Sequence, residues 1–109
     1  QTRIIGISVA RSRQRGQKAI LESLDFLEEP SESYLDHFDF LDGYTFGGYG
    51  LFNRELEEFT SKMARDTGLI LDNTYTGKAF YGMLDLMANG PWEGSSVFWH
   101  TGGLLNLMH

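Results

Sequence analysis

Short apolar runs alternate with amphipathic stretches along this chain of 109 residues. Ile4 to Val9 has the length and β-branched composition of a buried strand. From Ser12 to about Leu27, apolar residues recur at helical spacing, which predicts a helix capped by Ser12 with one buried stripe. The stripe consists of Ala19, Ile20, Leu21, Leu24 and Leu27. A strand followed at once by a helix indicates the start of an α/β unit.

The middle of the chain is less regular. We expect a loop over Glu28 to Ser33 and a passage from helix to strand over Tyr34 to Leu41, whose pattern suits both. Gly43 to Gly50 contains four glycines in eight residues, which predicts a loop that lets backbone or ligand approach closely. Asn53 then caps a helix that Gly68 ends.

The stretch from Leu69 to Phe80 is the anchor of our interpretation. An apolar run of strand length, Leu69 to Leu71, precedes three polar residues that bond nearby backbone and favour turns. These residues are Asp72, Asn73 and Thr74. Near-helical spacing of apolar positions then predicts a helix to about Asn89, which Gly90 and Pro91 end.

The last segments complete the expected fold. Ser95 to His100 is predicted as a strand and Leu104 to Met108 as a short helix. Strands that alternate with helices favour a parallel sheet flanked by helices in three layers, with right-handed crossovers. We therefore expect a single α/β domain over residues 1–109.

Composition narrows the function classes. The net charge is −6, and no broad basic surface is expected, which argues against nucleic acid or an anionic membrane as partner. The basic residues between Arg11 and Lys18 fit a solvated helix start. Without cysteine the chain has no disulfide, thiolate nucleophile or sulfur metal site. No apolar stretch approaches the length that spans a bilayer, and we expect a cytoplasmic location.

Most standard chemical motifs are missing. The glycines of the 43–50 loop have the wrong spacing for a dinucleotide fingerprint, and there is no Walker loop or serine elbow. His100 suits an acid, a base or a ligand, but a histidine at a strand end is more often hydrogen-bonded in place. An acidic run fits a solvated face better than a metal site, so we expect no metal. It comprises Asp36, His37, Asp39 and Asp42.

Three loops share a chemical character. Gly48 to Gly50, Thr74 to Gly77 and His100 to Gly103 each place a hydroxyl group beside glycine. In a parallel sheet the second and third loops would follow strands and open on the same side. Their phenols and threonine hydroxyls would then converge on a planar, polar ligand. The alternative for Thr74 to Gly77 is a capped helix without further function.

Three motifs in order resemble one enzyme family. They are Gly48-Tyr-Gly50 with Asn53, Leu71-Asp72 with Tyr75-Thr-Gly-Lys78, and His100-Thr-Gly-Gly103. They resemble the C-terminal part of the pyridoxal-phosphate enzymes that include D-cysteine desulfhydrase and 1-aminocyclopropane-1-carboxylate deaminase. The resemblance covers nearly the whole chain from Ile4 onward. It implies a partial tryptophan synthase β-like domain (fold type II) of a lyase or deaminase that acts on a small amino acid.

The resemblance also implies roles for individual residues. Tyr75 matches the phenol that serves as acid, base or nucleophile beside the substrate, and Tyr49 matches the second phenol near it. Thr101 sits where desulfhydrases place a hydroxyl against the pyridine nitrogen, and Gly102 belongs to the same cofactor-binding turn. Thr76 stands where the deaminases carry a glutamate for that nitrogen. A hydroxyl leaves the ring a weaker electron sink than a carboxylate, as in the desulfhydrase branch.

The chain also departs from the family pattern. Other residues replace a proline or alanine of the family, so the pocket shape is expected to differ; these are Phe52, Asn73, Leu105 and Asn106. The family's phosphate loop and the lysine that bonds the cofactor aldehyde precede Ile4 in the resemblance. Lys78 matches a family lysine of another role, so we expect this chain alone to be catalytically incomplete.

Two further hypotheses stand beside a fragment of a desulfhydrase-like enzyme. The expected partners of such a fragment are a small amino-acid substrate and a missing N-terminal segment or second subunit, with homo-oligomers expected. The first alternative is a non-catalytic, stand-alone α/β binding or interaction module, with a homodimer as one form. The second is an unrelated small α/β ligand binder.

Overall fold

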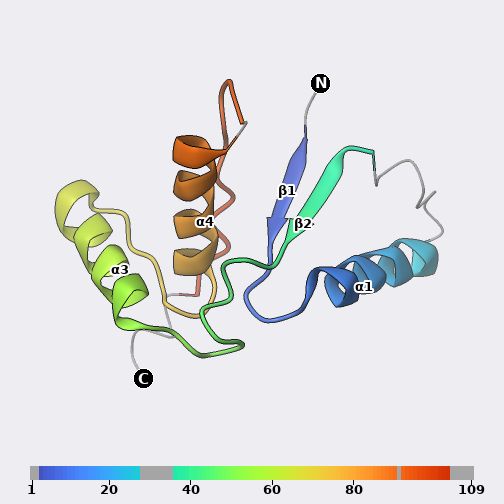
Figure 1. Ribbon diagram of the computed structural model, residues 1–109, viewed down its shortest axis with the longest axis horizontal. Coiled ribbons are helices and arrows are strands. Elements are labelled where there is room, and N and C mark those ends of the chain that lie inside the picture. The colour runs from blue at the N-terminus through green and yellow to red at the C-terminus, as the bar shows by residue number, and fades with distance from the viewer. Residues whose placement is uncertain (1–2, 28–35, 91, 104–109) are drawn as a thin grey trace.

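The computed structural model describes residues 3–27, 36–90 and 92–103. Within these ranges the chain forms two strands and three helices (Figure 1). In chain order they are β1 (Ile4–Ile7), α1 (Arg13–Phe26), β2 (Phe38–Leu41), α3 (Arg54–Thr67) and α4 (Thr76–Asn89). The predicted α/β class is confirmed.

The two strands form a parallel sheet. Ile4 lies opposite Phe38 and Ile7 lies opposite Leu41. The ladder continues past β1, because the Ser8 N–H donates to the Leu41 carbonyl at 2.7 Å. Parallel neighbours need a crossover connection, and α1 lies within it. The predicted parallel pairing is therefore confirmed for this pair of strands.

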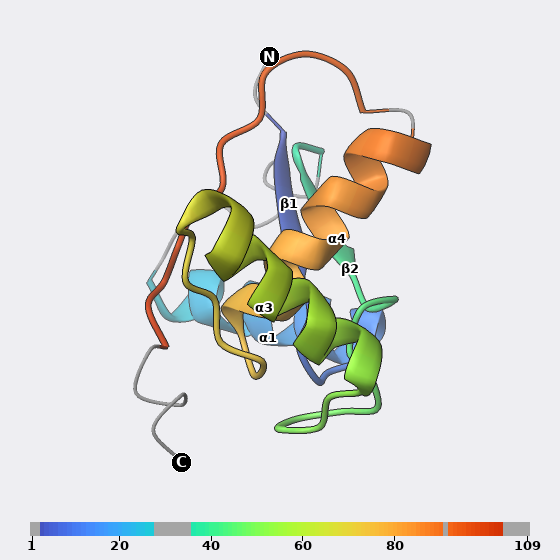
Figure 2. The ribbon, with the colours of Figure 1, turned by 90° about the vertical axis from the view of Figure 1, so that its left-hand side faces the viewer.

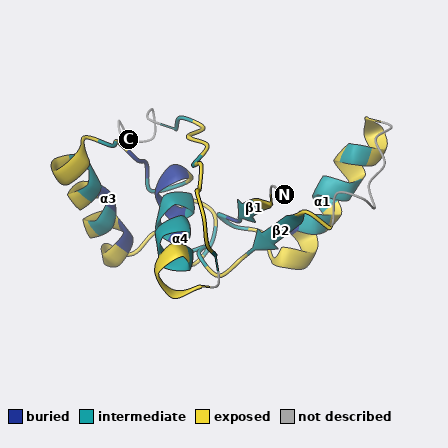
Figure 3. Cartoon of the chain, turned by 90° about the horizontal axis from the view of Figure 1, so that it is seen from above, coloured by how far each residue is buried: buried dark blue, intermediate teal, exposed yellow. Residues whose placement is uncertain are grey.

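Helices lie on both faces of the sheet. Gly16 of α1 packs so closely on Phe40 that a β-carbon there would lie 2.0 Å from the Phe40 ring. Gly82 of α4 packs on Ile7, which points to the opposite face. Figure 3 shows α1 on one side of the strands and α4 on the other, with α3 outside α4. Figure 2 shows α3 crossing α4, against which it packs.

Two predicted strands are wrong. Leu69 to Leu71 and Ser95 to His100 are neither strand nor helix in the structure. A strand exists only through hydrogen bonds to a neighbouring strand, and in the described sheet β1 and β2 pair only with each other. The two segments meet instead through a side chain, since His100 Nε2 lies 2.9 Å from the Ile70 carbonyl oxygen.

The buried stripe predicted for α1 is only partly correct. Gly16 is the one buried residue of this helix, and the predicted stripe is half-buried up to Leu24. Leu27 is exposed and the neighbouring Phe26 is 86% exposed. A helix of 14 residues is about 21 Å long, whereas two strands lie only about 5 Å apart. Figure 1 shows α1 running outward beyond this narrow sheet.

The predicted helix boundaries are confirmed where side chains cap them. The Ser12 hydroxyl accepts the Arg15 N–H at 3.3 Å, and Asn53 Oδ1 accepts the Leu56 N–H at 2.9 Å. Gly68 ends α3 in the left-handed conformation, with φ of 76°. These contacts involve residues close in sequence, which is why a local pattern predicts them.

Some expectations lie outside the described residues. They concern the loop over Glu28 to Ser33, the start of the Tyr34 to Leu41 passage and the helix over Leu104 to Met108. The end of that passage is described, and it forms β2 as expected. None of the helices in the described ranges is long and apolar enough to cross a bilayer.

Replacing Gly16 by alanine is expected to destabilise the fold by about 1–3 kcal/mol, because the new methyl group overlaps the Phe40 ring. The measurement is the midpoint of urea unfolding. Gly43→Ala is the matched control, since a β-carbon at Gly43 meets no atom within 4 Å. Equal midpoints for the two variants would contradict this account of how α1 packs on the sheet.

Candidate functional site

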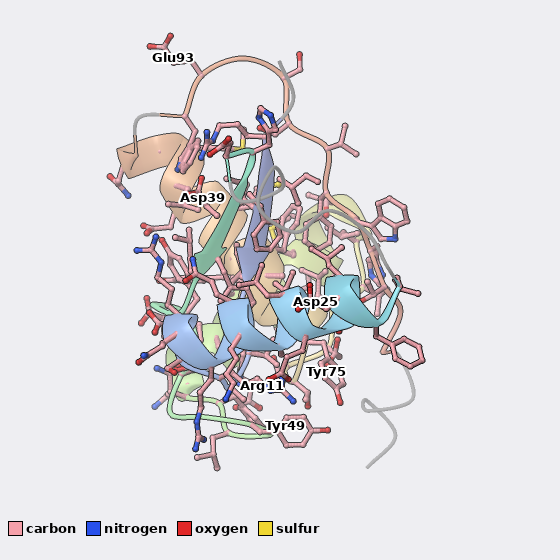
Figure 4. All side chains as sticks on the ribbon, turned by 90° about the vertical axis from the view of Figure 1, so that its right-hand side faces the viewer. Arg11, Asp25, Asp39, Tyr49, Tyr75 and Glu93 are labelled. Carbon is pink, nitrogen blue, oxygen red and sulfur yellow. The ribbon has the colours of Figure 1, made fainter. Side chains whose placement is uncertain are left out.

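Two tyrosines from separate loops meet at the surface. Tyr49 follows β2 in the chain, and Tyr75 immediately precedes α4. Their hydroxyl oxygens lie 2.5 Å apart, and their rings meet edge to face with centroids 6.0 Å apart. Tyr49 is 65% exposed and Tyr75 is 37% exposed. Figure 4 shows both side chains at the same end of the molecule. We call them the phenol pair.

The loop that carries Tyr49 has an unusual backbone. Gly47 and Gly48 have φ of 104° and 130°, a backbone conformation that residues other than glycine rarely adopt. The start of the loop is tied to α4, because the Tyr44 hydroxyl donates to Asp85 at 2.6 Å. Burial and this carboxylate raise the pKa of Tyr44 to about 12. The expected glycine loop is therefore present, and it is anchored on the helix that Tyr75 precedes.

A buried carboxylate shapes the turn that carries Tyr75. Asp72 Oδ2 accepts the N–H groups of Thr74 and Tyr75 at 2.9 and 2.8 Å. Asp72 Oδ1 accepts the N–H and the hydroxyl of Thr76 at 2.9 and 2.7 Å. These bonds satisfy donors at the start of α4, where a negative charge is also favoured by the helix dipole. Asp72 therefore fixes the backbone position of Tyr75.

The hydrogen bonds decide the charge state of Asp72. Burial by itself raises the pKa of this carboxyl, but the bonds from Thr76, Tyr75 and Thr74 outweigh burial. The net effect is a pKa below the ordinary value for aspartate. The group is therefore an anion at neutral pH.

Thr76 lies beneath the surface. Its hydroxyl donates to Asp72 Oδ1 and accepts the Asp72 N–H at 3.0 Å. Gly77 is packed equally tightly, because a β-carbon there would lie 2.4 Å from the Asp72 carbonyl oxygen. The Thr76 hydroxyl is thus already used inside the turn, and its predicted contact with a cofactor stays a prediction.

The third loop reaches the same turn from the end of the described chain. After α4 the chain returns alongside this helix, where the Phe98 ring packs on Phe80 with centroids 5.0 Å apart. His100 Nδ1 accepts the Gly102 N–H at 3.1 Å, so its hydrogen is on Nε2, which donates to the Ile70 carbonyl. His100 therefore has the hydrogen-bonded role that we considered more common.

Gly103 completes the contact between the loops. It has φ of 83°, and a β-carbon there would lie 2.6 Å from Asp72 Oδ1. Thr101 and Gly102 lie between the two anchors His100 and Gly103, and Thr101 is exposed. The second and third loops thus meet at Asp72, although neither follows a strand as expected. The first loop meets the second through the phenol pair, whereas the predicted convergence of all three loops on one ligand stays a prediction.

Sequence reasoning did not assign site roles to Asp72 and Lys78. Both are fully buried, and Lys78 is the largest fully buried side chain among the described residues. One signal was available for Lys78, since it is the sole charged residue between Thr76 and Leu84. A lone charge within such an apolar stretch indicates a specific partner.

Two carboxylates of the acidic run have partners within the chain. Asp39 pairs with Arg3 at 2.6 Å, and Asp42 accepts the Arg13 N–H at 2.7 Å at the start of α1. Across the described parts of the chain, no three or more histidine, aspartate or glutamate side chains are grouped to hold a metal ion. The two carboxylates therefore have structural partners.

No protein-family model matches the chain, but curated relatives do. A putative 1-aminocyclopropane-1-carboxylate deaminase of Pyrococcus horikoshii is 34% identical over 111 aligned positions, which cover 98% of this chain and 33% of the relative. The bifunctional D-cysteine desulfhydrase/1-aminocyclopropane-1-carboxylate deaminase of Arabidopsis thaliana, described as mitochondrial, is 48% identical over 63 residues. That match covers 55% of this chain and 16% of the relative.

The chain belongs to this deaminase and desulfhydrase family. A second putative deaminase, from Pyrococcus furiosus, agrees: it is 46% identical over 66 residues, 61% of this chain and 20% of the relative. The chain spans a third or less of the length of these relatives. The family resemblance drawn from the three motifs is confirmed.

The bond within the phenol pair affects the pKa of Tyr75 in this deaminase-family chain. The bond to Tyr49 is the largest cause that raises the pKa of Tyr75, followed by burial and the nearby charges. Tyr75 therefore keeps its proton to a higher pH than an isolated tyrosine. At neutral pH its hydroxyl is therefore protonated and hydrogen-bonded to the Tyr49 hydroxyl.

Asp72→Asn is expected to destabilise this deaminase-family chain at pH 7 by about 1–3 kcal/mol, because one amide oxygen cannot replace both carboxylate acceptors. The pKa of Asp72 is lower in the folded state than in the unfolded state. Its carboxylate therefore stabilises the fold above the unfolded pKa of about 3.9, and this contribution is lost as the pH falls through the folded pKa.

Urea unfolding at several pH values between 7 and 2 measures this contribution. The native chain should lose more stability on acidification than the Asn variant. Asp25→Asn, an exposed change on α1, is the control and should keep the native slope. Parallel pH profiles for the native chain and Asp72→Asn would refute the role given to Asp72.

Tyr49→Phe is expected to lower the pKa of Tyr75 toward its ordinary value of about 10, because the phenylalanine ring keeps the packing but has no hydroxyl. Carbon-13 labelling of the tyrosine rings allows the titration to be followed by NMR. Tyr81→Phe, which removes a phenol bonded to Glu55, is the control and should leave Tyr75 unchanged. An unshifted Tyr75 in the Tyr49 variant would show that the phenols do not interact.

Proposed function

We propose that this chain supplies one wall of the active site of a pyridoxal phosphate-dependent lyase or deaminase of the D-cysteine desulfhydrase type. The substrate class is a small amino acid, as the names of the relatives suggest. One observation carries the proposal. Two solvent-facing phenols from distant loops are hydrogen-bonded to each other, and the turn that carries Tyr75 also meets the threonine loop at Asp72.

The phenol pair suits proton transfer to or from a substrate. Tyr75 is protonated at neutral pH, and Tyr49 is bonded to its oxygen. Either oxygen can act as the donor, so one phenol can release a proton to a substrate while the other stabilises the charge that remains. We assign Tyr75 as the acid–base group or nucleophile and Tyr49 as its partner.

Pyridoxal phosphate, when bound, supplies an electron sink for negative charge that develops on the substrate. We assign the residues of the third loop to its ring nitrogen. The Thr101 hydroxyl is exposed and makes no hydrogen bond to another described residue, while Gly102 follows it in an anchored turn. A neutral hydroxyl would hold that nitrogen without the charge of a carboxylate. This property favours elimination of a good sulfur leaving group.

The lysines of this chain do not fit the cofactor aldehyde. Lys78 is buried against carbonyl groups. Lys62 is paired with Asp66 on α3, and Lys18 lies 3.9 Å from Glu22 on α1. We therefore propose that a preceding part of the polypeptide, or a second subunit, supplies the aldehyde-binding lysine and the phosphate loop. Residues 1–109 would then be the C-terminal part of a tryptophan synthase β-like domain.

The surface supports a covering partner of this kind. Val97 and Trp99 are 93% and 85% exposed, in an extended segment whose other side chains, Phe98 and His100, contact the body of the chain. A sheet of two short strands is also marginal by itself. Exposed apolar groups and open sheet edges favour association. The same surface would drive self-association in the alternative, a non-catalytic homodimeric module.

A chimaera tests the proposal. This chain replaces the matching third of the Pyrococcus horikoshii relative, and the parent relative is measured alongside. With pyridoxal phosphate we expect sulfide release from D-cysteine to exceed ammonia release from 1-aminocyclopropane-1-carboxylate. Tyr75→Phe should lower turnover by about 10²- to 10⁴-fold, because it removes the proton donor. Tyr81→Phe is the matched control and should retain turnover.

Two results would count against the proposal. One is an active parent with a folded chimaera that binds the cofactor but turns over neither substrate. The other is a stable homodimer of this chain, seen by gel filtration, that does not combine with the remaining two-thirds of the relative. The second result would favour the non-catalytic alternative.

A further inference from the structure

We infer that Lys78 is a positioning residue, whose buried ammonium fixes the loop that carries Tyr49 relative to the helix that follows Tyr75. This role follows from the hydrogen bonds of the Lys78 ammonium. Only its consequence for catalysis rests on the proposed function.

The ammonium of Lys78 joins three parts of the chain. Lys78 has 0% exposed surface, and its Nζ donates to the Gly48 carbonyl at 2.9 Å and to the Val9 carbonyl at 3.1 Å. Val9 lies just after β1, and Gly48 lies in the glycine loop after β2. Lys78 itself is in the first turn of α4. One cation thus connects both loops at the carboxyl end of the sheet to the start of this helix.

The bond between Lys78 and Gly48 joins the two segments that carry Tyr49 and Tyr75. Gly48 precedes Tyr49 in the chain, and Lys78 is three residues after Tyr75. The only backbone bonds that Gly48 makes within the described structure stay inside its own turn: its N–H donates to Thr45, and its carbonyl accepts the Leu51 N–H at 3.1 Å. The bond from Lys78 is therefore what ties the backbone of this turn to α4.

Packing alone does not explain a lysine at this position. Burial of a charge is costly unless the charge is hydrogen-bonded, and an apolar side chain of similar length would fill the same volume. Burial lowers the pKa of Lys78, and the charge of Asp72 opposes this change. The lysine therefore contributes bonds that methionine lacks, and these bonds lie between the two tyrosine-bearing segments.

Lys78→Met separates the packing of this side chain from its hydrogen bonds, since methionine keeps the volume and removes the ammonium. In the full chain, NMR titration of carbon-13-labelled tyrosines should show the pKa of Tyr75 falling toward about 10, because the phenol pair separates. The titration of Tyr44 should stay near pH 12, since its bond to Asp85 is independent of Lys78. Lys62→Met, an exposed change on α3, is the control and should alter neither group.

A double variant and a second substitution complete the design. In a Tyr49→Phe background, Lys78→Met should cause no further change in the Tyr75 titration, because its effect passes through Tyr49. Should Lys78→Met not fold, Lys78→Leu, which also lacks the donor group, gives the same titration readout. A folded Lys78 variant with a native Tyr75 titration would overturn the inference.

Turnover tests the catalytic consequence separately. In the chimaera with the Pyrococcus horikoshii relative, Lys78→Met should lower kcat by about 100-fold and change KM much less, because misplaced catalytic groups slow the reaction more than they weaken binding. A shifted Tyr75 titration with unchanged turnover would support the positioning role of Lys78 and contradict the proposed catalytic role of the phenols. The two failures are therefore distinguishable.

Discussion

The structure depends above all on one buried carboxylate. Asp72 accepts hydrogen bonds from three successive N–H groups and one hydroxyl, and so begins α4 at a fixed point. Gly103 packs against the same carboxylate from the far end of the described chain. Because water cannot replace these bonds in a buried site, the turn has one stable geometry. This turn therefore sets the position of Tyr75 and of its phenol.

The buried centre of the described chain is accordingly polar and lies beside the site. Leu56 and Leu71 are its buried apolar members, whereas Asp72, Thr76 and Lys78 are buried with their polar groups bonded. The sheet, by contrast, is small and leaves much of α1 uncovered. Further polypeptide over this narrow sheet would cover the exposed side of α1. This is the physical basis for proposing a fragment of a larger enzyme.

The elements that sequence predicted correctly are those fixed by near neighbours. Ser12, Asn53 and Gly68 set helix ends through contacts within a few residues. The segments at Leu69 to Leu71 and Ser95 to His100 have strand-like composition but are not strands. Composition favours an extended backbone, but only a neighbouring strand turns it into part of a sheet. That neighbour is a property of the whole fold.

The sequence by itself determined the family, the helix boundaries and the three loops with hydroxyl groups, because these follow from local order and spacing. Only the tertiary structure decided which groups meet. It brought Tyr49 to Tyr75 and placed Lys78 between two loops. These partners lie up to 69 residues apart in the chain. Contacts at such separations are set by packing, which no local pattern encodes.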